Sequence, residues 1–175
     1  MNNFELAYQF CAKHEFNAVR HYTNLAEDPG GSTNWGITQR AYDTFKHRYP
    51  GFPSDVKDLS EDQAKACDKG EYWPTWASIQ DDRLAAKLYD MGYNIGIGTA
   101  VKYLQDAVGV PVDGHMGPLT LASANQEDPE ATIKTLCAHL VRHYMAWVGQ
   151  DPTDRTQFQS GLLARAQSEP PTETS

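Results

Sequence analysis

Apolar side chains recur at helical spacing over most of this chain, and the first such run lies close to the N-terminus. The apolar positions within residues 4–12 predict a helix that ends at His14 or Glu15. The periodicity then stops, and a strong turn signal follows at Asp28-Pro-Gly-Gly. We therefore expect irregular structure after the first helix, with at most a small β-hairpin near residues 18–37.

Capping signals mark the next helices. Thr38 is a predicted N-cap, and Ser60 with Gln63 fits a capping box that opens a second helix. That helix is expected to stop before Pro74, because the residue that precedes a proline disfavours helical geometry. A stripe of apolar residues every third or fourth position then predicts a helix from Asp82.

The second half of the chain continues as helices. Gly96 interrupts the apolar stripe, a new stripe follows it, and Pro118 is placed as the first residue of a short helix. The clearest pattern starts at Asp128-Pro129 and is expected to close at Gly149. A weaker helix is predicted over residues 158–166. The fold class is therefore mainly α.

Composition narrows the choice of partners. Lys and Arg number 15 against 23 Asp and Glu, for a net charge of −8, which argues against a nucleic-acid partner and against stable association with anionic membranes. Three cysteines without a CxxC pair indicate free thiols, as in a protein that folds in a reducing cytoplasm. The N-terminus lacks the basic and apolar segments of a secretory signal.

A carboxyl residue at the end of the first helix, followed by an acidic, glycine-rich turn, is the strongest candidate for chemistry. Cleavage of a glycosidic bond needs little beyond two placed carboxyl groups and a water. Glu15 is the candidate acid, Asp28 or its neighbour Glu27 the candidate base, and Thr33 a candidate water ligand. The alternative is that Glu15 is a solvated surface residue and Asp28 only caps the turn.

Aromatic residues gather near the middle of the chain. Tyr72, Trp73, Trp76 and Tyr93 are candidates for stacking against sugar rings, and packing in the core is an equal alternative. Trp35, from the turn, is a further candidate for contact with the glycan. His139 and His143 have the i, i+4 spacing of zinc ligands but lack a catalytic Glu between them, so a structural role is favoured and no metal is expected.

At these residues the chain resembles glycoside hydrolase family 108, the muramidases of phages and bacteria. The segment Asp28-Pro-Gly-Gly-Ser-Thr-Asn-Trp-Gly-Ile-Thr38 is similar to the family pattern D-P-G-G-x-T-N-x-G-I-T, and Glu15 stands where the family has its first Glu. Leu88 to Gly96 resembles the F-D-x-x-x-N-x-G of the peptidoglycan-binding region that follows. In the family pattern F-x-x-G-W-x-x-R, Leu162 replaces the Trp.

The resemblance implies a lysozyme-like, mainly α fold and a lysozyme that hydrolyses the β-1,4 bond between N-acetylmuramic acid and N-acetylglucosamine without a cofactor. It implies Glu15 as general acid, with Asp28 and Thr33 positioning water. It adds Asp90 and Asn94, as cleft or buried polar residues, to the aromatic substrate-binding candidates. Bacterial peptidoglycan is the expected partner of a monomeric protein.

We expect a catalytic lobe over residues 1–80, a helical peptidoglycan-binding lobe over 81–167 that shares its core, and a disordered tail over 168–175. A phage endolysin that waits in the host cytoplasm for a holin is the expected setting, and an effector secreted into a rival cell is the alternative. A lytic transglycosylase and a glycan-binding module without turnover remain alternative functions.

Overall fold

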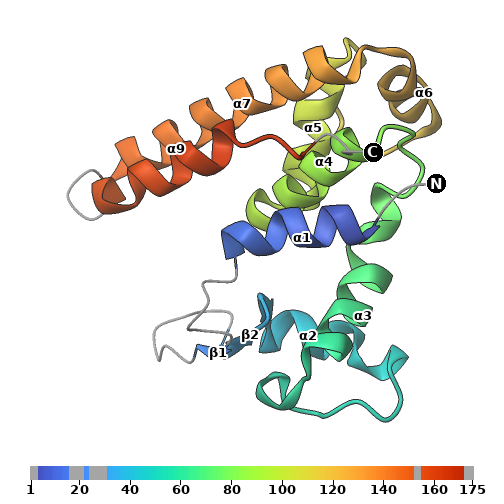
Figure 1. Cartoon of the computed structure of the whole chain (residues 1–175), viewed down its shortest axis with the longest axis vertical. Coiled ribbons are helices and arrows are strands. Elements are labelled where there is room, and N and C mark those ends of the chain that lie inside the picture. The colour runs from blue at the N-terminus through green and yellow to red at the C-terminus, as the bar shows by residue number, and fades with distance from the viewer. Residues whose placement is uncertain (1–3, 16–21, 24–30, 152–154, 172–175) are drawn as a thin grey trace.

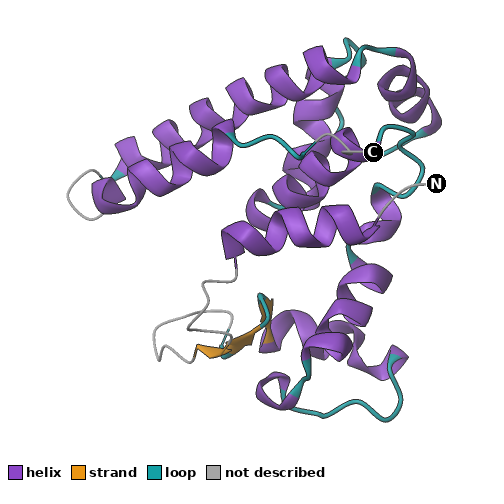
Figure 2. Ribbon diagram, in the orientation of Figure 1, coloured by secondary structure: helices purple, strands orange, loops and turns teal. Residues whose placement is uncertain are grey.

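The computed structural model describes residues 4–15, 22–23, 31–151 and 155–171, except for the side chains of Glu15 and Thr23. The described chain is mainly helical, and its longest helix forms the top of the molecule in the view of Figures 1 and 2. The α-helices are α1 (Phe4–Glu15), α2 (Gln39–Phe45), α3 (Glu61–Glu71), α4 (Asp82–Ile95), α5 (Ile97–Ala107), α6 (Pro118–Gln126), α7 (Pro129–Gln150) and α9 (Gln159–Gln167). Short 3-10 turns are η1 (Lys46–Arg48), η2 (Val56–Asp58), η3 (Trp73–Thr75) and η4 (Thr156–Phe158).

A small antiparallel sheet lies below the end of α1 (Figure 2). Its strands are β1 (Tyr22–Thr23), β2 (Thr33–Asn34) and β3 (Ile37–Thr38), in the order β1-β2-β3. Thr33 pairs with Thr23 on one side and Thr38 on the other. The predicted hairpin is therefore a three-stranded sheet with two-residue strands, because β3 adds a strand just before α2.

The main core joins the first helix to the second half of the chain. Helix α1 packs against α4, and α4 packs against α5 and α7. Their apolar stripes, read from the sequence at helical spacing, meet in one cluster of buried side chains. The mainly α, lysozyme-like fold expected from the sequence is confirmed, and α1 belongs to the same core as the C-terminal helices.

The far end of α7 extends from this body and carries α9 along its length (Figure 1). We call α7 and α9 the arm. A second, smaller core lies at the bottom of the view, between the sheet, α2 and α3, and it contains Ile37, Tyr42, Phe45, Val56, Leu59, Ala64 and Cys67. The side chain of Asn34 fixes this lobe, since its amide donates to the carbonyl oxygens of Val56, Lys57 and Leu59 at 3.0–3.2 Å.

The capping predictions are confirmed in detail. Thr38 accepts from the amide of Ala41, and Ser60 and Gln63 form the reciprocal capping box of α3. Asp128 caps α7, whose first residue is Pro129. Helices that carry these signals begin where the sequence places them, because a cap satisfies backbone donors that have no partner inside the helix.

The segment after α9 departs from the prediction. Residues 168–171, assigned from the sequence to a disordered tail, are held by contacts, and residues 172–175 lie outside the described residues. The Ser168 hydroxyl donates to the carbonyl of Arg165, and the carbonyl of Pro170 accepts from Arg83 at 3.1 Å. Proline content alone suggested disorder, but the segment finds polar partners on the body of the protein.

None of the described helices combines the length and the apolar character that crossing a membrane requires.

Candidate active site

The candidate acid stands at the end of α1, where the helix leaves the main core. Glu15 is the last residue of that helix, and its side chain is not among those described. Asp28 and its rival Glu27 lie outside the described residues, so their distance from Glu15 stays open. Thr33 is half-buried in the middle strand β2. The sheet that carries Thr33 lies below the end of α1 (Figure 1).

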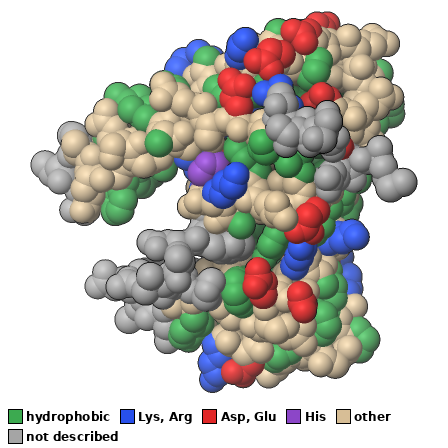
Figure 3. All heavy atoms as spheres, in the orientation of Figure 1, with side chains coloured by type: hydrophobic (Ala, Val, Ile, Leu, Met, Phe, Trp, Pro, Cys, Tyr) green, Lys and Arg blue, Asp and Glu red, His purple; other side chains and the backbone are tan. Residues whose placement is uncertain are grey.

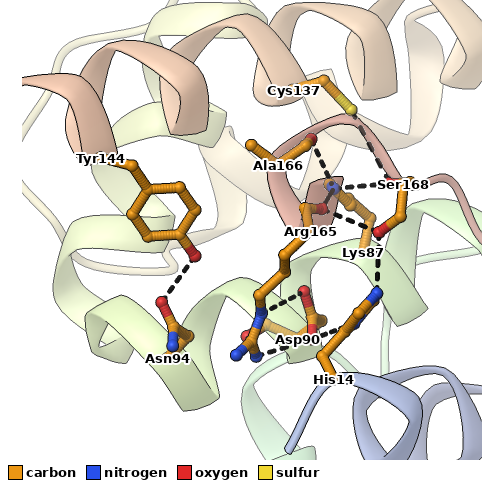
Figure 4. A network of polar contacts seen from close by, with 9 residues as sticks. All are labelled: His14, Lys87, Asp90, Asn94, Cys137, Tyr144, Arg165, Ala166 and Ser168. Atoms are coloured by element: carbon orange, nitrogen blue, oxygen red, sulfur yellow. Dashed lines mark hydrogen bonds and ion pairs between the residues drawn. The ribbon is translucent and has the colours of Figure 1, made fainter. Parts of the chain in front are cut away.

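A buried ion-pair network holds the end of α1 (Figure 4). His14 Nδ1 donates to Asp90 Oδ1 at 3.1 Å, and Arg165 Nη2 donates to the same oxygen at 2.8 Å. Asp90 is fully buried on α4. Side chains from α1, α4 and α9 therefore meet at the Asp90 carboxylate. His14, the member from α1, directly precedes Glu15 in the chain.

The charge of Asp90 is stabilised by these two partners. Burial alone raises the pKa of a carboxyl, but the hydrogen bond from His14 and the charge of Arg165 bring the pKa of Asp90 below its ordinary value. The carboxylate is therefore ionised at neutral pH and keeps both partners oriented. This makes the end of α1 a fixed point in the structure.

The opposite side of the network fixes the end of α9. His14 Nε2 lies 3.0 Å from the hydroxyl of Ser168. The ammonium of Lys87 donates to the carbonyl oxygens of Ser168 at 2.7 Å and Ala166 at 3.1 Å, although the residue has no exposed surface. Burial lowers the pKa of Lys87. A cation at this place also complements the negative end of the helix dipole of α9.

A second contact joins α4 to the turn of the sheet. The hydroxyl of Tyr93 donates to the carbonyl oxygen of Trp35 at 3.1 Å. The indole nitrogen of Trp35 donates to Leu59 at 3.1 Å. Gly36 permits this approach, since a Cβ there would lie 2.3 Å from the Tyr93 hydroxyl, and its φ of +77° favours glycine.

Four of the candidate substrate-binding residues divide between surface and interior. Tyr72 and Tyr93 are half-buried with ring centroids 5.4 Å apart, so the structure brings them together beside Trp35. Trp73 is only 7% exposed and packs against Phe4 in the main core. Its ring is occupied by core contacts, which corrects its placement among sugar-binding residues.

The two polar candidates on α4 also differ. Asp90 is sealed in the ion-pair network and does not face a ligand. Asn94 is exposed, and its carbonyl oxygen accepts from the hydroxyl of Tyr144 at 2.6 Å (Figure 4). Asn94 therefore remains available through its amide group, whereas Asp90 has a structural role.

The surface is hollowed between the arm and the lower lobe, and a histidine lies beside a basic side chain at the inner end of this hollow (Figure 3). Two pockets of about 420 Å³ each border α9 and share Leu162. The first pocket is lined by Asn94, Ile95, His143, Tyr144, Trp147 and Leu162. The second is lined by Lys13, His14, Phe158, Gly161, Leu162, Ala164 and Arg165. The second pocket therefore adjoins the candidate acid.

The histidine pair on α7 has other partners than a metal. The ring of His139 stacks on Tyr103 at 4.8 Å and its Nε2 lies 3.0 Å from an oxygen of Asp106, and His143 Nδ1 lies 2.9 Å from the Tyr103 hydroxyl. Across the described stretches of chain, no group of three His, Cys, Asp or Glu side chains is placed to hold a metal ion. The contacts of His139 and His143 with Tyr103 and Asp106 are those of side chains that pack α7 against α5.

Two family models match consecutive parts of the chain. Residues 10–96, which include the end of α1, the sheet and the network residue Asp90, match the family Glycosyl hydrolase 108. Residues 99–167, which include α7 and α9, match the Predicted Peptidoglycan domain. The chain belongs to the glycosyl hydrolase 108 family. This glycosyl hydrolase 108 protein is thus a glycoside hydrolase that acts on peptidoglycan, and the ion-pair network joins its two matched regions.

The solved structure of SagA from Brucella abortus is similar over nearly the whole length. It has 26% sequence identity and a TM-score of 0.64, covering 91% of this chain and 92% of that chain. A comparison with the curated proteins found no match.

The parts of the site that depend on distant contacts carry no local signal in the sequence. His14, Lys87 and Ser168 were not candidates, although they hold the ends of α1 and α9 together. Arg165 had a signal, since it occupies the Arg of the family pattern near the C-terminus. Its partner Asp90 was a candidate for a different role.

Proposed function

We propose that this glycosyl hydrolase 108 protein is an N-acetylmuramidase that cleaves the β-1,4 bond between N-acetylmuramic acid and N-acetylglucosamine. The observation that carries the proposal is the fixed end of α1. His14 is bound on both ring nitrogens, which holds the last turn of α1, and Glu15 is the final residue of that helix. A general acid has to be positioned in this way before it can donate to a bound substrate.

In the proposed reaction, the Glu15 carboxyl protonates the glycosidic oxygen as the bond to the anomeric carbon breaks. The oxygen of one water forms the new bond to that carbon, and the departing proton of the water goes to Asp28 or Glu27, with Thr33 holding the water. Trp35, Tyr72 and Tyr93 supply aromatic and polar surface for the glycan, and Asn94 supplies an amide donor. The reaction needs no cofactor.

The test replaces Glu15 with Gln, which keeps the shape and removes the proton. Release of reducing sugar from purified sacculi should fall by about a hundredfold or more, in line with the usual contribution of a general acid. Glu127→Gln, at an exposed acidic residue beyond α6, is the matched control and should keep the parental rate. A Glu15→Gln variant as active as its parent would refute the assignment of Glu15 as the general acid.

Two further variants separate the candidate bases. Asp28→Asn should lower the rate strongly and Glu27→Gln should not, and the reverse result would move the role to Glu27. Mass spectrometry of the released muropeptides tests the bond chemistry, since hydrolysis adds one water. Anhydro-sugar products would instead identify a lytic transglycosylase, and binding to sacculi without any release would identify a glycan-binding module.

We also propose that the protein serves as a phage endolysin that reaches the wall from the host cytoplasm through a holin. Expression in the cytoplasm of a bacterium should leave the culture intact until a membrane pore is supplied, and lysis should then follow within minutes. Lysis without a pore would contradict this route.

A further inference from the structure

The second pocket under the arm has an unusual charge for this protein. The chain carries a net charge of −8, yet the described residues that line this pocket include the basic side chains Lys13, His14 and Arg165, and none of these described residues is acidic. The pocket is therefore a local basic site on an acidic molecule. Basic residues that line a concave site focus their field on an anion within it.

The cations of this site differ in their availability. Arg165 and His14 are both bound to Asp90. Lys13 is exposed at the end of α1, and within the described part of the chain it has neither an ion pair nor a hydrogen bond. Its ammonium is thus the group that can pair with an incoming anion.

The network behind the pocket adds to the positive charge. Lys87 and Arg165 are two buried or nearly buried cations, and Asp90 is the buried carboxylate that Arg165 binds. The Lys87 ammonium donates its hydrogen bonds to carbonyl oxygens at the end of α9, not to a carboxylate. The arrangement therefore keeps more positive than negative charge behind the wall of the pocket.

The remaining wall is apolar and shallow. Phe158 is 53% exposed, and Leu162 and Ala164 continue the apolar surface, with Gly161 leaving room between them. A cavity of about 420 Å³ is within the range of sites that hold small molecules. The pocket thus fits a group that combines a carboxylate with short aliphatic carbon.

We propose that this pocket binds a carboxylate-bearing substituent of the wall glycan, with Lys13 as its ion-pair partner. The inference rests on the proposed function, because it places the substituent next to the sugar held at Glu15. In peptidoglycan the carboxylate belongs either to the stem peptide or, where that peptide is absent, to the lactyl group of muramic acid. Lys13 is then a specificity-determining residue, which favours substituted wall glycan over neutral polymers.

Binding to the full chain is measured in the Glu15→Gln background, so that turnover does not interfere. Three fluorescently labelled oligosaccharides are compared: glycan with stem peptides, glycan stripped by an amidase, which exposes the lactyl carboxylate, and chitin oligomers, which have no carboxylate. Lys13→Ala should weaken binding of a carboxylate-bearing ligand about fivefold, as expected for one partly exposed ion pair. Lys13→Arg should retain the affinity.

Chitin binding should be unchanged in all variants. Lys134→Ala is the matched control, because Lys134 is an exposed lysine on α7 that lines neither pocket, and it should leave every affinity unchanged. The difference between parent and Lys13→Ala should shrink as salt is raised. A fivefold loss with the stem-peptide ligand alone assigns the pocket to the peptide, and a loss with the stripped ligand assigns it to the lactyl group.

Equal weakening for all three ligands, or no weakening for any of them, overturns the proposal. The outcome is independent of whether Glu15 is the acid: if Glu15→Gln remains active, the proposed catalytic role fails, and binding measured at a temperature too low for turnover still decides the role of Lys13.

Discussion

Removal of Arg165 is the sharpest test of the ion-pair network. The substitution Arg165→Met keeps most of the aliphatic length but leaves Asp90, which is fully buried, with His14 as its remaining side-chain partner in the network. Breaking a buried ion pair from one side costs about 3–5 kcal/mol of unfolding free energy. For a chain of this size the cost corresponds to a decrease in Tm of about 6–20 °C.

The pH dependence separates a charge effect from a packing effect. The pKa of Asp90 is lowered in the folded protein, so its contribution to stability is complete above the pKa of the unfolded chain and is lost as pH falls through the folded value. Urea unfolding is monitored by tryptophan fluorescence at pH values from about 7 down to about 3. The unfolding free energies of the parent and of Arg165→Met should converge as the pH falls.

Two controls make the result interpretable. Lys134→Met removes an exposed cation that pairs with Glu130, and it should change stability by less than about 0.5 kcal/mol. Asp90→Asn combined with Arg165→Met should recover much of the loss, because it leaves no unpaired buried charge. A loss in Arg165→Met that is the same at every pH, or a double variant as unstable as the single one, would refute the electrostatic reasoning.

Two other substitutions test the remaining contacts. Gly36→Ala should lower the free energy of unfolding by about 2 kcal/mol or more, because it adds a clash with Tyr93 to the strain of a positive φ. Gly51→Ala is the control, since Gly51 also has a positive φ, of +92°, but open space around it. Equal losses of stability for the two variants in a thermal melt would contradict the clash. Burial raises the pKa of Asp68 well above its ordinary value. The stability this carboxyl contributes is therefore present below its unfolded pKa and lost as pH rises toward the folded one. Asp68→Asn should accordingly gain stability relative to the parent between about pH 5 and about pH 8 in urea unfolding, and a difference that does not change with pH would argue against a neutral, buried carboxyl.

Local features of the fold were predictable from the sequence. The capping box of Ser60 and Gln63 and the Asp128 cap of α7 act within three residues, so the chain contains all the information that they need. The apolar stripe from Leu84 to Ile95 likewise predicted α4. The acid at the end of α1 was a candidate because that helix end is itself a local feature.

The parts of the site that the sequence did not predict are those that depend on long separations. Lys87 reads as a solvated lysine, and only the end of α9 explains why it is buried. From the sequence, Asp90 is either a cleft residue or a buried polar one, and only Arg165, 75 positions later, supplies the charge partner that decides between them. Trp73 belongs to the core because α1 and α4 close around it. Spacing in the sequence does not encode these contacts.

The meeting of His14, Asp90 and Arg165 also has a consequence for synthesis on the ribosome. The glycosyl hydrolase 108 region emerges first, but the guanidinium that neutralises its buried carboxylate is made 75 residues after that carboxylate. A nascent or prematurely terminated chain therefore lacks the partner that completes the end of α1. We expect the end of α1 to stay incomplete until Arg165 has left the ribosome, so that a chain released before that residue lacks a stable site.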